Sequence, residues 1–277
     1  MNPFEYDFGY AWQYSYVHLI PLAIGLIALL LSIRFKRSRW LVASSAIISL
    51  WGLAGLLIVQ FGLRVNLPLE LPTQAFMTTG EGRVLDVGAG SGRATLMVLL
   101  ERPKTSVVAL DWFKMGYGID GNTPARLVKN AAIANVSHRV EVQSADMRQM
   151  PFPAESFDAV VSAYAVDHMA REQSLRALHE VNRVLRPGGE FLLEVLEADA
   201  YVHTAFPIIG AHGYFGPNNV VARWRDLLQQ ADFEVTESGH VPGTLYMLAR
   251  KPMGASDAVS LRSDSNDQLD ATSAAVE

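Results

Sequence analysis

The stretch Arg83-Val84-Leu85-Asp86-Val87-Gly88-Ala89-Gly90-Ser91-Gly92 decides the fold of this chain. It reads as a short apolar strand that ends in an acid and is followed by glycines at every second position. Residues 93–100 then continue as a predicted helix. A strand that breaks into a glycine-rich turn and enters a helix is typical of doubly wound α/β folds that hold a nucleotide-like cofactor. Glycine permits this because its backbone can take positive φ and lie directly against a ligand.

A second apolar strand, predicted over residues 105–111, also ends in an acid, Asp111. Asp111 lies about 20 residues beyond the glycines, where an acid at the end of the second strand binds ribose hydroxyls. The glycines are spaced G-x-G-x-G instead of G-x-G-x-x-G, which argues against a dinucleotide and therefore against a nicotinamide oxidoreductase.

The rest of the chain alternates strands and helices, which predicts a Rossmann-like, doubly wound, mainly parallel seven-stranded sheet with helices on both faces. The predicted strands are 83–87, 106–111, 139–144, 157–163, 189–197, 233–240 and 244–250. The predicted helices are 93–101, 123–135, 171–185 and 219–231.

Further motifs follow the glycine turn in a fixed order. They are Ser144-Ala145-Asp146-Met147, Met150-Pro151-Phe152-Pro153, residues 156–161 and Val184-Leu185-Arg186-Pro187-Gly188-Gly189. With them, residues 82–251 resemble the class I S-adenosylmethionine-dependent methyltransferases, close to the branch often called methyltransferase type 11. The resemblance implies S-adenosylmethionine as the cofactor and a methyl acceptor as the substrate.

The resemblance also implies a set of cofactor-binding residues: Asp86, Gly88, Gly90, Gly92, Asp111, Trp112, Asp146 and Met147. The three glycines would approach the methionine moiety, and Asp86 would accept hydrogen bonds from its amino group. Asp111 would hold the ribose. From the residues alone, Asp86 also fits a cap on the turn, and Asp111 fits an exposed acid at a strand end.

On the adenine side, Trp112 would pack against the ring, Asp146 would accept from the adenine amino group, and Met147 would flank the ring. Simple core filling is an equally good interpretation of Trp112. An ordinary loop is the alternative for Asp146 and Met147.

Candidate catalytic residues follow the fourth strand, at the carboxyl edge of the sheet where ligands bind in this type of fold. His168 or Asp167 would remove a proton from the nucleophile, and Tyr164 would orient it. A His beside an Asp at a strand-to-helix junction is also a common helix cap. The connection after the fifth strand supplies more candidates for the substrate pocket: Tyr201, His203, His212 and Tyr214. The glycines and aromatics of residues 113–121 predict a mobile lid over the cofactor.

Two uncharged apolar stretches, residues 17–33 and 41–63, precede the α/β region. The second has 23 residues, about 34 Å as a helix, which is enough for a hydrocarbon core of about 30 Å. Both are apolar nearly all round, which predicts a membrane hairpin over residues 17–64 and disfavours a buried helical pair in a soluble dimer.

Before the hairpin, aromatic residues occupy every second position: Phe4, Tyr6, Phe8, Tyr10, Trp12, Tyr14 and Tyr16. Aromatic rings favour the membrane–water interface, so residues 1–16 are predicted to form an interfacial anchor. A strand with one aromatic face is the alternative.

Two arguments about the orientation of the hairpin in the membrane conflict. Residues 34–39 carry four basic side chains, and the positive-inside rule places them in the cytoplasm. With two full spans the α/β domain would then lie outside, although its cofactor is made and used inside cells. The expectation is therefore a re-entrant or monotopic hairpin, or one segment that only dips into the leaflet, with the domain on the cytoplasmic side and the basic loop against anionic lipid.

Composition excludes several kinds of substrate and site. The 277 residues carry a net charge of −5 with no basic tract in the α/β region, which argues against nucleic-acid substrates. The chain has no cysteine, so thiolate metal sites and a cysteine nucleophile are excluded. Residues 65–81 are predicted to be a linker, 82–252 the catalytic domain and 253–277 a disordered tail.

Together these features predict a membrane-anchored methyltransferase acting on a small, hydrophobic or lipid-like acceptor. The alternative is a membrane-tethered, non-catalytic binding or scaffold protein with the same fold. The sequence does not give the acceptor atom, the oligomeric state, or whether a general base takes part.

Overall fold

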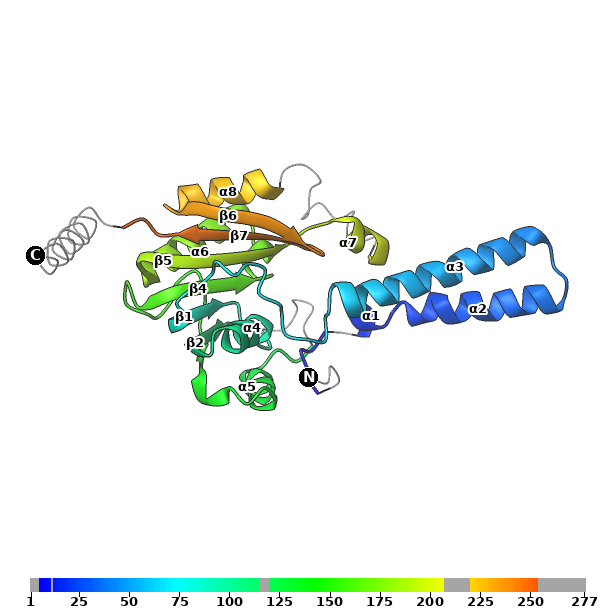
Figure 1. The fold of residues 1–277 in the computed structure, drawn as a ribbon, viewed down its shortest axis with the longest axis horizontal. Coiled ribbons are helices and arrows are strands. Elements are labelled where there is room, and N and C mark those ends of the chain that lie inside the picture. Colours follow the sequence, from blue (N-terminus) through cyan, green and yellow to red (C-terminus); the bar gives the residue numbers. More distant parts are fainter. Residues whose placement is uncertain (1–4, 11, 115–119, 207–219, 254–277) are drawn as a thin grey trace, which may run out of the picture.

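The computed structural model describes residues 5–10, 12–114, 120–206 and 220–253. Its centre is a seven-stranded sheet in the order β3-β2-β1-β4-β5-β7-β6 (Figure 1). The strands are β1 (Glu81–Val87), β2 (Lys104–Asp111), β3 (Val140–Ser144), β4 (Phe157–Ala163), β5 (Leu185–Leu196), β6 (Glu234–Val241) and β7 (Thr244–Arg250).

The strand directions confirm a Rossmann-like α/β fold with seven strands but make the sheet mixed. Strands β1 to β5 pair in parallel, whereas β7 runs antiparallel to both β5 and β6. The reason is the connection between β6 and β7, which consists of Pro242 and Gly243, with Gly243 at φ +72°. Two residues can only join antiparallel neighbours, because a parallel pair needs a crossover.

The predicted helices are present as α4 (Arg93–Glu101), α5 (Pro124–Ile133), α6 (Arg171–Val184) and α8 (Val220–Gln230), with a shorter α7 (Ala200–Ala205) after β5. Single-turn helices lie at Ser137–Arg139 and Val166–His168. Thr123 caps α5 by accepting a hydrogen bond from the backbone of Arg126, and Pro124 opens the helix.

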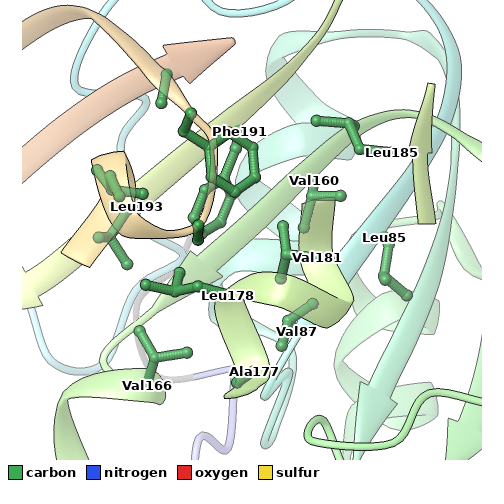
Figure 2. Close-up of a cluster of buried hydrophobic side chains, with 14 of the residues drawn as sticks. Leu85, Val87, Val160, Val166, Ala177, Leu178, Val181, Leu185, Phe191 and Leu193 are labelled. Atoms are coloured by element: carbon green, nitrogen blue, oxygen red, sulfur yellow. The ribbon is translucent and has the colours of Figure 1, made fainter. Parts of the chain in front are cut away.

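Two hydrophobic cores cover the two faces of the sheet because successive strand residues point to opposite sides. Leu85, Val87 and Val160 pack on one face against α6 and α8 (Figure 2). Val84, Val161 and the side chains of α4 form the other.

The extended segment before the hairpin belongs to this second core. Tyr6 and Phe8 are buried, and their rings stack with centroids 5.5 Å apart. The described part of this segment forms no strand, but its alternate aromatic rings at Tyr6 and Phe8 are buried in the core and do not take the interfacial position expected for them. Trp12, in the short helix α1 (Trp12–Ser15), remains exposed.

Helices α2 (Leu19–Arg34) and α3 (Arg39–Leu57) form a hairpin that projects from the domain as an arm (Figure 1). A π-helical turn, η1 (Ile58–Gly62), continues α3, so that one continuous helix of 24 residues runs from Arg39 to Gly62. This is the helix, among the described residues, that is long and apolar enough to cross a membrane. Helix α2 has 16 residues, about 24 Å, and falls short of that length. The expectation of two membrane-length helices is therefore supported for the second only.

The hairpin is polar inside and apolar outside. The side chains and backbone that α2 and α3 bury between them are those of Gly25, Ser32, Ser45, Ser49, Gly52 and Gly55. A Cβ on Gly52 would lie 2.5 Å from the backbone nitrogen of Leu22, so the helices pack closely. Ser45 and Ser49 donate their hydroxyls to carbonyls one turn earlier. Large apolar side chains such as Leu30 and Leu50 face outward, each about two-thirds exposed.

The root of the hairpin is joined to α7. The ring of His18 is buried, and its Nε2 lies 2.7 Å from the carbonyl oxygen of Ala205. Trp51 donates from Nε1 to the carbonyl of Thr204 at 2.9 Å. Gly55 makes room for this contact, since a Cβ there would lie 2.0 Å from the His18 ring.

Candidate functional site

The glycine turn after β1 brings the backbone close to the end of β4. Gly88 has φ +81°, and a Cβ added to it would lie 2.2 Å from the Cβ of Ala165. The backbone N–H groups of Gly88 and Ala89 donate to the carbonyl of Leu110 at 2.8 and 3.0 Å. The turn is thereby fixed against the end of β2, and Gly92 begins α4 as its N-terminal cap.

Asp111 ends β2 with its carboxylate directed at the glycine turn. Its Oδ2 accepts from the backbone N–H of Gly90 at 2.9 Å. Its Oδ1 accepts from the backbone of Phe113 and from the side chain of Asn122, at 2.5 and 3.1 Å. A carboxylate oxygen can accept two hydrogen bonds, so Oδ2 retains one position for a ribose hydroxyl.

Two adjoining cavities lie at this edge of the sheet and share Gly88, Gly90, Tyr164 and His168 in their walls. We name the first the outer cavity; its remaining wall is Asp111, Trp112, Lys114, Asn122, Ala145, Asp146, Met147, Arg148, Ala165, Met169 and Gln173. We name the second the inner cavity; its remaining wall is Tyr10, Leu69, Ala89, Ser91, Arg93, Ala94 and Ala163. Six of the eight predicted cofactor residues line the outer cavity.

At the far end of the outer cavity, Trp112 is 44% exposed, so it does not fill the core. The ammonium of Lys114 sits 3.3 Å from the centroid of its ring. Asp146 is paired with Arg148, whose Nη2 donates to Oδ2 at 2.6 Å, and the hydrogen bonds from Arg148 lower the pKa of Asp146. Asp146 is therefore a charged acceptor at this end.

The residues in the wall fit an S-adenosyl group on three counts. The glycine turn exposes backbone to both cavities at Gly88 and Gly90, so a ligand can lie directly against it. Asp111 offers an unused acceptor position in the cavity wall. The exposed Trp112 and the thioether of Met147 provide surfaces for a flat ring at the other end.

Asp86 and Gly92 lie outside both cavity walls. Asp86 is completely buried, and its Oδ2 accepts from the Thr95 hydroxyl at 2.6 Å. Burial raises the pKa of Asp86 to about 7. The bond to Thr95 joins β1 to α4, while Oδ1 of Asp86 is buried with no hydrogen-bond partner among the described residues.

A second buried acid, Glu194 near the end of β5, has no counterpart among the predicted site residues. It is fully buried, its Oε1 has no hydrogen-bond partner, and burial raises its pKa to about 8. The positive charge of Arg93 acts in the opposite direction, and the negative charge of Asp86 adds to the rise.

The predicted catalytic residues separate into two groups. Tyr164 and His168 line both cavities, whereas Asp167 is buried with its Oδ2 accepting from the backbone of Leu196 at 3.0 Å. Asp167 thus anchors the end of β5. Tyr164 has φ +52°, its hydroxyl is bonded to that of Thr244, and burial raises the pKa of Tyr164. Of the three, His168 is the imidazole that lines both cavities.

The candidates beyond β5 contribute little to these walls. Tyr201 and His203 lie on α7, exposed and away from both cavities. His212 and Tyr214, like most of the predicted lid, lie outside the described residues, as does the tail from residue 254.

Arg93, Arg148 and Glu194 belong to the site region but were not predicted. The position of Arg93 directly after the last glycine was the available signal, since that residue must begin α4 beside the turn. Arg148 follows Asp146 by two positions, a spacing that permits a local ion pair. Nothing local in the apolar run of β5 shows that Glu194 is buried.

Comparison with known proteins agrees with this geometry. Residues 84–189 match the model of a methyltransferase domain. A ubiquinone/menaquinone biosynthesis C-methyltransferase from Syntrophotalea carbinolica is 28% identical over 114 residues, 41% of this chain and 44% of that protein. A sterol 24-C-methyltransferase from Aspergillus fumigatus is 35% identical over 121 residues, 43% of this chain and 29% of that protein.

Among solved structures, an O-methyltransferase family protein from Burkholderia thailandensis shares the fold, with a TM-score of 0.53 and 13% identity over 75% of this chain and 61% of that one. The chain spans less than half the length of the two curated relatives. The sequence matches support the predicted methyltransferase class and its cofactor, S-adenosylmethionine, for the α/β domain.

Proposed function

We propose that this protein is a membrane-anchored methyltransferase that moves the methyl group of S-adenosylmethionine to a small, hydrophobic or lipid-like acceptor. The observation that carries the proposal is the junction of the two cavities at Gly88, Gly90, Tyr164 and His168. The outer cavity has the acceptors and ring surfaces suited to the nucleoside. The inner cavity offers separate space beside the glycine turn.

The chemistry is an in-line displacement in which the acceptor atom attacks the methyl carbon while the carbon–sulfur bond breaks. When bound, S-adenosylmethionine supplies the activated methyl group. The protein's part is to align the two reactants and exclude water, which is worth up to about 7–11 kcal/mol in favourable cases. Gly88 and Gly90 hold the backbone against the cofactor, Asp111 fixes the ribose, and His168 takes the acceptor's proton where the acceptor carries one.

The hairpin supports the membrane part of the proposal. Its buried interface consists of glycine and serine, while its outer surface consists of leucine, isoleucine and tryptophan. Small residues at a helix–helix contact with apolar side chains outside are the arrangement expected in lipid, where close packing and not the hydrophobic effect joins helices. Arg34, Lys36, Arg37 and Arg39 lie exposed at its tip, suited to anionic head groups.

The lipid-like acceptor is supported by the relatives and by the hairpin. Two relatives are named for quinone biosynthesis and for a sterol. An anchor is useful to an enzyme whose acceptor partitions into the bilayer. We place the α/β domain on the cytoplasmic side, where the cofactor is available.

The first test is calorimetric titration of the full chain in detergent with S-adenosylhomocysteine and, separately, with NAD. We expect micromolar binding of the first and none of the second. Labelled methyl should then appear in a lipid extract and not in protein. A folded sample that binds no S-adenosylhomocysteine would refute the enzyme and favour the non-catalytic scaffold.

A further inference from the structure

Arg93 connects the glycine turn to the chain that leaves the hairpin. Its Nε donates to the carbonyl of Leu67 at 2.8 Å, and its Nη2 donates to that of Arg64 at 3.0 Å. The helix from Arg39 ends at Gly62, so these carbonyls lie just beyond its C-terminus. The α/β domain thus holds the chain that leaves the hairpin with one of its own side chains.

The same guanidinium holds the chain that enters the hairpin. Its Nη1 donates to the Tyr10 hydroxyl at 3.2 Å, and its central carbon lies 5.5 Å from the centroid of the Tyr10 ring and 5.9 Å from that of Phe8. The Ser91 hydroxyl in the glycine turn donates to the carbonyl of Phe8 at 2.6 Å. Both flanks of the hairpin therefore converge on the turn.

These contacts build one side of the inner cavity. Tyr10 comes from the entering flank, Leu69 from the leaving flank, and Arg93 lies between them; Gly88 and Gly90 belong to the same wall. A displacement of either flank would change the cavity that adjoins the cofactor.

We propose that Arg93 is a positioning residue that couples the hairpin to the cofactor site: by holding the chain that leaves the hairpin and Tyr10 in the chain that enters it, Arg93 keeps the inner cavity closed on that side, so that cofactor affinity depends on both flanks being in place. The inference rests on the proposed function for its ligand. It assigns to the hairpin a part in building the site as well as in anchoring.

The chain offers a matched control at the other end of α4. Arg102 is buried and donates to the carbonyls of Phe76 and Gln74 at 2.8–3.1 Å. Like Arg93, it donates hydrogen bonds to backbone carbonyls of the chain between the hairpin and β1. Unlike Arg93, it lies outside both cavity walls. Loss of Arg102 should lower stability without touching the site.

The experiment is titration of the full chain in lipid nanodiscs with S-adenosylhomocysteine, comparing wild type, Arg93→Met, Arg93→Lys and Arg102→Met. We expect at least tenfold weaker binding for Arg93→Met. Arg93→Lys should recover part of the loss, because an ammonium keeps the charge but lacks the planar fork. Arg102→Met should bind within about twofold of wild type. Unchanged affinity in Arg93→Met, or an equal loss in Arg102→Met, would overturn the coupling.

Hydrogen exchange covers the case in which Arg93→Met does not fold. In wild type, S-adenosylhomocysteine should slow amide exchange in residues 5–10 and 63–69, and no change there would overturn the proposal. If wild type binds no ligand, the proposed function fails by itself. Amide exchange in ligand-free Arg93→Lys then tests whether Arg93 holds the chain that leaves the hairpin. Faster exchange at residues 63–67 supports this role, and unchanged exchange refutes it.

Discussion

The carboxylate of Asp111 and the backbone N–H of Gly90 are joined by a hydrogen bond of 2.9 Å, so the end of β2 and the glycine turn form one unit. The acid that we propose for the ribose is therefore oriented before any ligand arrives. Pre-orientation of this kind removes part of the entropic cost of binding.

Asp111→Ala should weaken S-adenosylhomocysteine binding by at least tenfold, or about 1.4 kcal/mol. The change removes the ribose acceptor and frees three donors that Asp111 now satisfies. Calorimetry measures the loss. Asp226→Asn serves as the control, because Asp226 is exposed on α8 and paired with Arg171, outside both cavity walls. Equal affinity of wild type and Asp111→Ala would remove Asp111 from the site.

Gly88→Ala should abolish cofactor binding, because its Cβ would lie 2.2 Å from that of Ala165 and the turn would have to move. Gly80 is the matched control: it has φ +69°, but no heavy atom lies within 4 Å of an added Cβ. Gly80→Ala should thus cost only the left-handed backbone strain, about 1–2 kcal/mol. Thermal unfolding of both variants measures the cost of backbone strain. Ligand titration of both variants then shows the additional effect of the close contact at Gly88. Binding by Gly88→Ala comparable to that of Gly80→Ala would contradict the close approach.

Glu194→Gln should flatten the fall of stability with pH. Burial raises the pKa of Glu194 to about 8, well above its ordinary value of 4.5, so the folded state retains a proton that the unfolded state releases between these values. The contribution of Glu194 to the free energy of unfolding is fully present below pH 4.5 and is lost as the pH rises through about 8. Over this range the folding equilibrium constant falls by at most about tenfold for each pH unit. Denaturant unfolding at pH 5 and pH 8 tests this. The prediction is wrong if wild type and variant lose the same free energy of unfolding between pH 5 and pH 8.

His168→Gln should reduce the transfer rate by about 10²-fold or more if the acceptor carries a proton, while leaving S-adenosylhomocysteine affinity within a few-fold. Glutamine keeps hydrogen-bonding capacity but cannot accept a proton near neutral pH. Single-turnover transfer and calorimetry on the same sample distinguish the two effects. An unchanged rate would assign His168 to shaping the cavity.

The absence of cysteine allows the sidedness to be measured directly. Arg37→Cys places a thiol at the exposed hairpin tip, and Ser137→Cys places one on the exposed turn before β3. With a re-entrant or monotopic hairpin, an impermeant maleimide should label both from the cytoplasmic side only. Labelling of residue 37 from the opposite side would establish that the hairpin crosses the bilayer fully.

Local pattern was enough to predict the strands, the glycine turn and six residues of the outer cavity wall. Residues 83–92 carry a strand, an acid and three glycines in an order that leaves few conformations, and Thr123 and Pro124 specify a helix start by their own chemistry. Such features depend on neighbours within a few positions, so the sequence is sufficient to find them.

The features that were missed depend on distant partners. The alternation of Tyr6 and Phe8 fits a lipid interface as well as a core, and the choice is made by α4, some 90 residues later. The role of Arg93 is set by carbonyls 26 and 29 residues earlier, and backbone carbonyls leave no mark in a sequence. Asp167 and His168 are adjacent, yet one anchors β5 and the other faces the cavities.

Asn130 of α5 bonds to the backbone of Asp7 across 123 positions of sequence. On the ribosome, the entering flank of the hairpin must therefore wait until most of the first half of the protein has been made. The arm of residues 19–62 has its helical partners close by and can form much earlier. The nascent chain can therefore form its arm while both flanks are still unattached, and the cavity wall that uses Tyr10 and Leu69 is completed later.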